Sequence, residues 1–442
     1  MSDRYTNYLL WSSVARSMSY PEVLQVEPTN VCNLSCVMCV RRTWRQTDYN
    51  HMSFSLFQKI VDESVGRVRK IALYGFGEPL AHPRFTDFVR YARSQLGDDV
   101  FLHFVTNGTL MDESKAKTVF EAGVNQVAFS IDAPELEPLW RIRVGTQRYS
   151  VLDNLSVTAR LKEDFGARVG IATVLMKSNY KLLPELVRRA ADLNLDFVVV
   201  SHMVPYHPAL VGEAVYTTAS REAVEFYKAT GSNLDTLAKD AIYDAMLTHY
   251  KLVSSGKQQL YLELVEKISQ KGYSVNVDIA RDAVSRENLL RDVEAYLEEA
   301  KEIARSAGLE IQLPSTYADS LSRSCPYIDE KAVMILQDGN VAPCMDLAYE
   351  HPLYTNLHVK TIKAVHFGNV KNESLEEIWN KPDFVRFRKA RENLPKGVPW
   401  CADCPFATRR CWYTESNNYD CYGNDVGCNE CIYSAGLAHC II

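Results

Sequence analysis

Three cysteines near the N-terminus have a spacing typical of iron-sulfur ligands. Cys32, Cys36 and Cys39 form a CxxxCxxC sequence directly after a short apolar run. Three thiolates on one loop bind three irons of a 4Fe-4S cubane and leave the fourth iron open to a small ligand, as catalysis requires. A zinc knuckle normally adds a fourth Cys or His nearby, and a chance cluster of buried thiols is the other alternative. The spacing therefore favours a catalytic 4Fe-4S cluster.

The other nine of the twelve cysteines lie beyond residue 324. In a long chain without an export signal, so many thiols indicate metal binding rather than disulfides. Nine thiols fill two four-thiolate sites with one left over, or one full site and one with an open iron, and CxxC pairs also suit a zinc ribbon. The candidate ligands are Cys325, Cys344, Cys401, Cys404, Cys411, Cys421, Cys428, Cys431 and Cys440.

Short polar motifs end four of the apolar runs. The glycines of YGFGEP permit close backbone approach, and its carboxylate can accept a hydrogen bond from an ammonium group. TNG, SID and MKSN also end apolar runs, although such residues are common in ordinary turns. These motifs contain Gly77, Glu78, Pro79, Thr106, Asn107, Ser130, Asp132 and Asn179.

Six apolar, β-rich runs alternate with helical stretches and must position these motifs. Near-continuous apolar strands separated by helices indicate a parallel sheet covered by helices. Six such units suit a partial (β/α)6 barrel of the α/β class, whose ligands bind at the carboxyl ends of the strands. The predicted strands are 23–26, 71–74, 100–105, 127–131, 169–175 and 197–200.

The sequence also predicts an extension before the barrel, an insertion within it and a small domain after it. Residues 1–20 form the extension and 21–312 the barrel, in which the alternation lapses into helical sequence at about 205–285. A charged amphipathic helix at 286–307 and the short extended segment LEIQLP follow. Residues 313–442 form a small cysteine-rich domain.

The composition excludes two classes of partner. The 442 residues include 49 Lys and Arg against 55 Asp and Glu, and the net charge of -6 gives no basic surface for nucleic acid. No apolar run reaches the roughly 20 residues of a membrane helix, and the N-terminal residues lack the apolar core of a signal peptide. We therefore expect a cytoplasmic protein with neither nucleic-acid nor membrane partners.

With its motifs in this order, the chain resembles the radical S-adenosylmethionine (SAM) superfamily. The resemblance implies that the N-terminal cluster binds SAM and cleaves it reductively to a 5′-deoxyadenosyl radical. It also implies that the residues of the four polar motifs are the candidate cofactor-binding residues. In the family YGFGEP meets the amino group of SAM, and SID and MKSN lie near its ribose and carboxylate. The family usually has an aromatic residue before the third cysteine, near adenine; here it is Met38, whose polarizable thioether can fill that site.

The C-terminal region resembles the SPASM extension of radical SAM enzymes. It has a predicted hairpin flanked by Cys325 and Cys344, a GN…SLEEIW segment and a CxxC run. The resemblance implies one or two auxiliary 4Fe-4S clusters, with Cys325 and Cys344 on the nearer and Cys401, Cys404 and Cys411 on the farther. Six residues separate Cys404 from Cys411, one more than the family usually has, so the last four thiols stay unassigned.

The resemblance further implies oxidative radical chemistry on a peptide or protein, with ferredoxin or flavodoxin as electron donor. Auxiliary clusters would accept an electron from the product radical. Asp346, two residues after Cys344, is a candidate general base, although most Asp residues in turns only cap or solvate. EPTNVCNLSCVMCVRRTW and CYGNDVGCNECIYSAGLAHC are similar to the maturases associated with tungsten-pterin aldehyde oxidoreductases.

Two other functions compete with a maturase. A radical SAM dehydrogenase, epimerase or decarboxylase would act on a small molecule such as a sugar or aminoglycoside, and a closed pocket without a peptide groove would favour it. A non-enzymatic electron carrier with several clusters is the second alternative. It has no need of the motifs that the resemblance places around SAM.

Replacing Cys32, Cys36 and Cys39 together by Ala is expected to abolish SAM cleavage and to leave iron bound in the C-terminal region. The reason is that these side chains are the proposed ligands of one cluster alone. The measurement is 5′-deoxyadenosine formed from SAM and dithionite, with the iron content of the same preparation. If the triple variant forms 5′-deoxyadenosine, the assignment is wrong.

Overall fold

The computed structural model describes residues 20–44, 48–230, 233–249, 256–408 and 411–442. Six parallel strands pair with one another in sequence order. Each begins and ends within two residues of a predicted run, which confirms the α/β class and the parallel sheet. The strands are β1 (Val23–Val26), β2 (Lys70–Ala72), β3 (Phe101–Thr106), β4 (Gln126–Ser130), β5 (Arg168–Leu175) and β6 (Phe197–His202).

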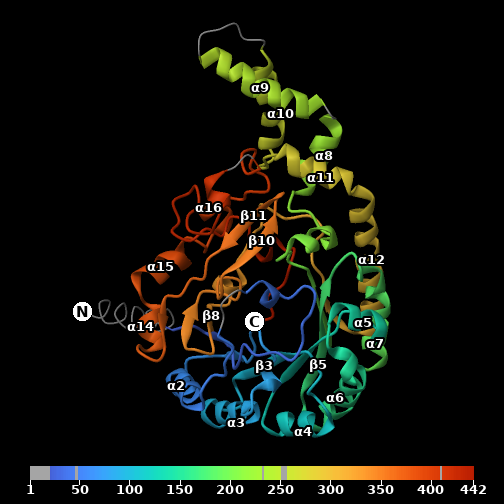
Figure 1. Ribbon diagram of the computed structural model, residues 1–442, viewed down its shortest axis with the longest axis vertical. Helices are drawn as coiled ribbons and strands as arrows, with labels where there is room; N and C mark the ends of the chain where they lie inside the picture. Colours follow the sequence, from blue (N-terminus) through green and yellow to red (C-terminus); the bar gives the residue numbers. More distant parts are fainter. Residues whose placement is uncertain (1–19, 45–47, 231–232, 250–255, 409–410) are drawn as a thin grey trace, which may run out of the picture.

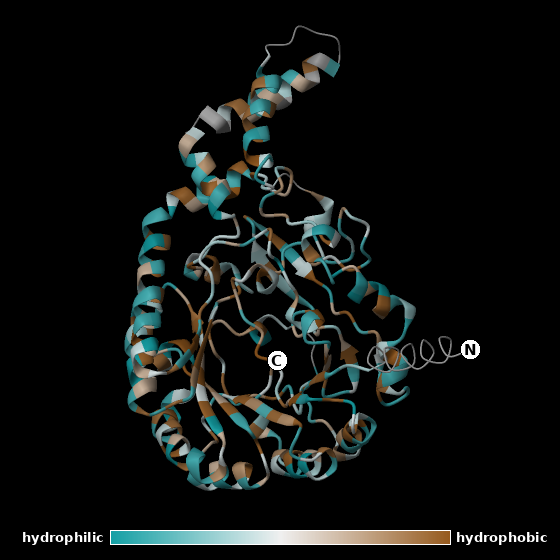
Figure 2. Ribbon diagram, turned by 180° about the vertical axis from the view of Figure 1, so that it is seen from behind, coloured by the Kyte–Doolittle hydropathy of each residue, from teal (hydrophilic) through white to brown (hydrophobic). Residues whose placement is uncertain are grey.

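Helices cover the outer face of this curved sheet, and its inner face surrounds the centre of the molecule (Figure 1). In α3, for example, Phe85, Phe88, Val89 and Ala92 are buried at helical spacing. The polar faces of the helices turn outwards (Figure 2). The covering helices are α2 (Phe54–Ser64), α3 (Phe85–Leu96), α4 (Glu113–Glu121), α5 (Leu136–Ile142), α6 (Val151–Phe165), α7 (Leu183–Asp192) and α12 (Glu287–Ala307).

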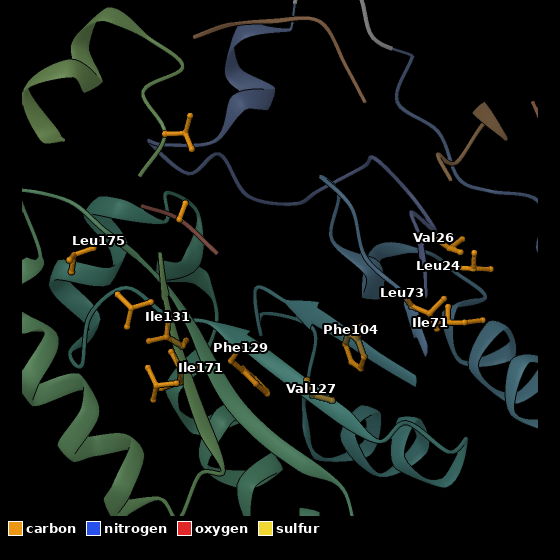
Figure 3. Close-up of a cluster of buried hydrophobic side chains, with 14 of the residues drawn as sticks. Leu24, Val26, Ile71, Leu73, Phe104, Val127, Phe129, Ile131, Ile171 and Leu175 are labelled. Carbon is orange, nitrogen blue, oxygen red and sulfur yellow. The ribbon is translucent and has the colours of Figure 1, made fainter. Parts of the chain in front are cut away.

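Apolar side chains of the strands form the main hydrophobic core (Figure 3). Leu24 and Val26 of β1, Phe104 of β3 and Phe129 of β4 are fully buried in it. Because strands of a helix-covered parallel sheet are buried on both faces, near-continuous apolar runs such as these fix the position of each strand. The core thereby fixes the carboxyl ends of the strands, where the polar motifs begin.

The predicted insertion is helical and includes an arm that projects from the barrel (Figure 1). The arm has a small core of its own, formed by residues such as Tyr227, Ala238 and Ile268. In it α9 and α10 pack against each other. The elements of the insertion are η5 (Pro208–Glu213), α8 (Arg221–Thr230), α9 (Asn233–His249), α10 (Lys257–Ser269) and α11 (Val277–Ser285).

The cysteine-rich region is joined to the barrel through the sheet itself. β8 (Ala332–Ile335) pairs in parallel with β1, and β9 (Asn340–Ala342) and β12 (Gly368–Asn369) extend that edge in antiparallel fashion. β7 (Glu310–Gln312), in the predicted extended segment, adds to the opposite edge beside β6. The boundary predicted at residue 313 therefore falls within one continuous sheet and stays a prediction.

Shorter elements complete the C-terminal region: the hairpin of β10 (His351–Thr355) and β11 (His358–Ile362), α13 (Pro326–Asp329), α14 (Leu375–Trp379), α15 (Pro382–Lys389) and α16 (Leu394–Gly397). The last residues return to the centre of the barrel (Figure 1). There the Lys70 ammonium donates to the backbone oxygen of Ile442 at 2.9 Å, and the Tyr74 hydroxyl donates to that of Ile441.

Two further predictions concern the ends and partners of the chain. The extension predicted at residues 1–20 lies outside the described residues except for Tyr20. Among the helices that the structure describes, none combines the length and the apolar character needed to cross a membrane.

Candidate functional site

The three N-terminal cysteines lie together on the loop between β1 and η1 (Val40–Thr43). Each thiol is an electrostatic neighbour of the other two. Burial raises the pKa of all three thiols, that of Cys36 to about 12. Three soft donors on one loop fit a three-thiolate 4Fe-4S site. Among the described residues, no group of three or more His, Cys, Asp or Glu side chains is placed to bind a single metal ion. A 4Fe-4S cluster needs a different arrangement, because each thiolate binds a different iron.

Hydrogen-bond donors and cations surround this loop. The Leu34 amide and the Asn107 side chain donate to the Cys32 sulfur at 3.5 and 3.7 Å. Arg143 places Nη1 4.0 Å from the Cys36 sulfur and pairs with the buried Asp132 at 2.7 Å. Donors and positive charge near sulfur favour the anionic, metal-bound thiolate. Arg143 was not among the predicted site residues, because it belongs to none of the short motifs.

The YGFGEP motif is packed directly against the cysteine loop. A Cβ on Gly77 would lie 2.2 Å from the Thr29 carbonyl oxygen, so glycine is needed for backbone contact with the loop. Glu78 is buried, and its carboxylate accepts from the Thr106 hydroxyl and the Asn107 amide, both at 2.7 Å. Burial raises the pKa of Glu78 to about 7. The motif therefore joins the ends of β2 and β3 to the loop.

Pro79 is the first residue of a short 3-10 helix, η2 (Pro79–Ala81), which follows Glu78 directly. The Glu78 carboxylate accepts from the Leu80 amide at 3.1 Å and so caps this helix. Neither residue needs a ligand to explain its position.

The motifs after β4 and β5 are joined in a similar way. The Asn179 side chain donates to the backbone oxygens of Asp132 and Val174, both at 2.9 Å, and accepts from the Met176 amide at 2.7 Å. The Asp132 carboxylate accepts from the Val174 amide at 2.8 Å. These side chains are occupied in holding the strand ends together, and their direct contact with SAM stays a prediction.

A cavity of about 280 Å³ lies between the barrel and the C-terminal region. From the barrel side its wall includes the predicted Met38 and Ser130, together with Arg143 and Thr173. The opposite wall carries the C-terminal residues Cys325, Cys344, Asp346, Cys431 and Cys440. The structure thus brings both cysteine regions to a single cavity.

Eight of the nine C-terminal thiols form two groups. Cys325, Cys344, Cys428 and Cys431, the inner thiol group, are all electrostatic neighbours of one another, and burial is the main cause that raises the pKa of the Cys344 and Cys431 thiols.

The outer thiol group consists of Cys401, Cys404, Cys411 and Cys421. Cys401 is an electrostatic neighbour of Cys404, and Cys421 is one of both Cys404 and Cys411. Cys421 is exposed at the surface. Two sets of four soft donors fit two fully coordinated clusters. Cys440 belongs to neither set.

The turn between Cys428 and Cys431 connects the two groups. The side chain of Asn429 in this turn donates to the Cys401 sulfur at 2.9 Å and accepts from the Lys360 ammonium at 2.8 Å. Lys360 is 1% exposed and pairs with Glu430 at 3.1 Å. This buried network had no signal in the sequence, because Lys360 lies far from any cysteine along the chain.

Asp346, the predicted general base, lies in the wall of this cavity. Its Oδ1 is 3.6 Å from Nε2 of His351, a buried ring whose Nδ1 is 2.9 Å from the Tyr349 carbonyl oxygen. Among the described residues the His351 Nε2 has no hydrogen-bond partner. The carboxylate therefore has a nitrogen base directly behind it.

Glu27, at the end of β1, connects the cysteine loop region with the C-terminal region. Its carboxylate accepts from the Tyr349 hydroxyl at 2.5 Å and from the Phe76 amide at 2.8 Å. Burial raises the pKa of Glu27 to about 7. Glu27 was not among the predicted site residues, because its neighbours along the chain do not indicate that it is buried.

Two family models match the chain. Residues 26–190 match the radical SAM superfamily, and residues 325–405 match the SPASM iron-sulfur cluster-binding domain. The first range contains the N-terminal cysteine loop, and the second contains Cys325, Cys344, Cys401 and Cys404.

Individual relatives match as well. The tungsten-containing aldehyde ferredoxin oxidoreductase cofactor-modifying protein of Pyrococcus furiosus is 27% identical over 428 residues, covering 95% of this chain and 97% of the relative. The PqqA peptide cyclase of Gluconobacter oxydans is 23% identical over 48% of this chain and 60% of the relative. The crystal structure of SuiB from Streptococcus suis has a TM-score of 0.53 at 12% identity, covering 92% of this chain and 76% of that one, a likeness of fold.

The raised pKa of Glu27 predicts a pH-dependent stability. The pKa rises from 4.5 in the unfolded chain to about 7, so the folded state binds more protons and loses stability as the pH rises through this window, by roughly 3 kcal/mol. Glu27→Gln, which cannot ionise, is expected to flatten this part of the dependence. The measurement is the urea midpoint of metal-free protein at several pH values, and equal slopes in both proteins would contradict the prediction.

Proposed function

Since the chain belongs to the radical SAM superfamily and carries a SPASM iron-sulfur domain, we propose that it is a maturase that oxidises a peptide or protein side chain. The protein is a radical SAM enzyme, and its cofactors are a SAM-binding 4Fe-4S cluster, SAM and auxiliary iron-sulfur clusters. When bound, the first cluster supplies the electron that cleaves SAM into methionine and a 5′-deoxyadenosyl radical.

One observation carries the proposal. The wall of a single cavity contains Met38, from the N-terminal cysteine loop, and Cys325, Cys344 and Cys431 of the inner thiol group. A substrate in this cavity has the radical-forming loop on one side and an electron acceptor on the other. Loss of a hydrogen atom, then of an electron and a proton, amounts to a two-electron oxidation.

The loop residues are proposed to hold the cluster and SAM in different ways. Cys32, Cys36 and Cys39 are the cluster ligands, and Met38, Ser130 and Arg143 face the cavity in which SAM binds. The remaining motif residues act as positioning residues, because their polar atoms bond to neighbouring loops. They are Gly77, Glu78, Pro79, Thr106, Asn107, Asp132 and Asn179.

Asp346 is proposed as the general base that takes the proton from the oxidised substrate. It lies in the cavity wall next to the inner thiol group, where the proton and the electron leave the substrate together. His351 lies behind it, with Nε2 at 3.6 Å from Oδ1. The His351 Nδ1 donates to the Tyr349 carbonyl oxygen at 2.9 Å, and this contact holds the ring with Nε2 towards Asp346.

The name of one relative, a peptide cyclase, supports a peptide as substrate. The relative that covers nearly the whole chain is named for modifying the cofactor of a tungsten-containing aldehyde ferredoxin oxidoreductase, which supports a role in the maturation of such an enzyme. We therefore propose a peptide or an oxidoreductase subunit as the substrate, and ferredoxin or flavodoxin as electron donor.

The test incubates reconstituted protein, SAM and dithionite with peptides and oxidoreductases encoded beside its gene, and with candidate sugars. The expected product is a peptide or protein that has lost two hydrogen atoms, detected by mass spectrometry with one 5′-deoxyadenosine per event. Oxidation of a sugar alone, with the peptides unchanged, would replace the maturase by the small-molecule alternative.

Asp346→Asn is expected to lower formation of the oxidised product by about 10²–10⁴-fold, the usual contribution of a general base. Cleavage of SAM should continue, because radical formation precedes proton removal. Glu350→Gln, at an exposed carboxylate paired with Lys363, is the matched control and should leave the product unchanged. An equal loss of SAM cleavage in Asp346→Asn would show that this residue does not act as the base.

A further inference from the structure

The cavity contains one thiol that neither four-thiol group uses. Cys440 shares the cavity wall with Met38 and Ser130. Cys325 is its thiol neighbour, and the other members of the inner group are not among the charges that affect it. Within the part of the chain that the structure describes, its sulfur has no hydrogen-bond partner.

A second group in the same cavity indicates that a ligand binds there. His202 is 2% exposed, and its Nε2 is 3.1 Å from the Ser315 carbonyl oxygen. Its Nδ1 has no partner among the described residues. Burial lowers the pKa of His202 to about 3, so the ring is neutral and Nδ1 is left as an acceptor. A buried acceptor without a partner is completed by a ligand that donates a hydrogen bond.

We propose that Cys440 is a hydrogen-atom donor to carbon radicals in this cavity, which rests on the radical chemistry proposed above. Its S–H bond breaks, a C–H bond forms at the radical carbon, and the sulfur becomes a thiyl radical. One electron from an external low-potential one-electron reductant and one proton from solvent restore the thiol. The substrate regains its hydrogen, so the same cavity supports a redox-neutral change such as inversion at carbon, besides oxidation.

The fixed position of Cys440 supports this role. Its segment is held against β6, because the His202 amide donates to the Leu437 carbonyl oxygen at 3.3 Å and the His439 amide donates to the Ser201 hydroxyl at 3.0 Å. The thiol is thereby held at the cavity wall that it shares with Met38 and Ser130.

Four tyrosines also line this cavity, and their hydroxyls are the competing donors. Tyr74 already donates to the backbone oxygen of Ile441, and Tyr327 donates to the Gln25 side chain. Tyr433 is hydrogen-bonded to Tyr206, which acts as acceptor. Tyr206 is therefore the phenol to compare with Cys440.

The test uses full-length protein, reconstituted anaerobically in D2O, with SAM and dithionite and no added substrate. The 5′-deoxyadenosyl radical then takes deuterium from the exchanged S–D bond, and mass spectrometry measures deuterium in 5′-deoxyadenosine. Cys440→Ser keeps a polar group but has a stronger O–H bond, so it is expected to form 5′-deoxyadenosine and to lose the deuterium. Tyr206→Phe is the matched control and is expected to retain it.

Iron and sulfide contents provide a readout apart from turnover. Cys440→Ser is expected to bind as much of both as the wild type, because eight other thiols complete the two groups. Retained deuterium in Cys440→Ser, loss in Tyr206→Phe alone, or a lower iron content in Cys440→Ser would each overturn the proposal. If the wild type forms no 5′-deoxyadenosine, both the proposed function and this inference are wrong. If it forms 5′-deoxyadenosine, the deuterium content tests the role of Cys440 separately from the proposed function.

Discussion

The geometry of the N-terminal site depends on a backbone contact that leaves no room for a side chain. A Cβ on Gly77 would lie 2.2 Å from the Thr29 carbonyl oxygen and 2.6 Å from that of Val31. At this contact the Glu78 amide donates to the Val31 carbonyl oxygen at 2.8 Å. The Glu78 carboxylate then bonds to the end of β3, so the cysteine loop and two strand ends form one unit. A shift of any member would move all three thiols.

A cation or an amide donor also lies beside each thiol group. Arg143 lies near Cys36, the Arg391 guanidinium donates to Cys428 at 3.2 Å, and Lys360 reaches Cys401 through Asn429. Burying Arg143 and Lys360 has a desolvation cost that their paired carboxylates offset in part. Their positions favour the negative charge of metal-bound thiolates, which explains why such pairs occur inside the protein.

Much of the fold was predictable because the signals were local. Runs such as 23–26 and 169–175 are nearly continuous in apolar residues, and these strands formed where the sequence indicated. The pairing of β8 with β1 was not predictable, since a run of four apolar residues does not specify its neighbour. The cysteine spacing identified the thiols, but the grouping of Cys428 and Cys431 with Cys325 depends on tertiary packing. Arg143, Glu27 and Lys360 were missed for the same reason: burial of a charged residue has no local pattern.

The pairing of β8 with β1 and the position of the last residues in the centre of the barrel affect how the chain folds. Lys70 and Ile442 are 372 positions apart. β1 can pair with β8 only after some 300 further residues have been synthesised. The cavity therefore depends on contacts between residues far apart in the sequence, and such contacts form slowly. During synthesis the N-terminal part emerges first, and one edge of β1 stays unpaired in the meantime. An unpaired strand edge is a site for aggregation. Until β8 of the cysteine-rich region pairs with β1, this edge of the incomplete barrel can therefore pair with strands of other chains.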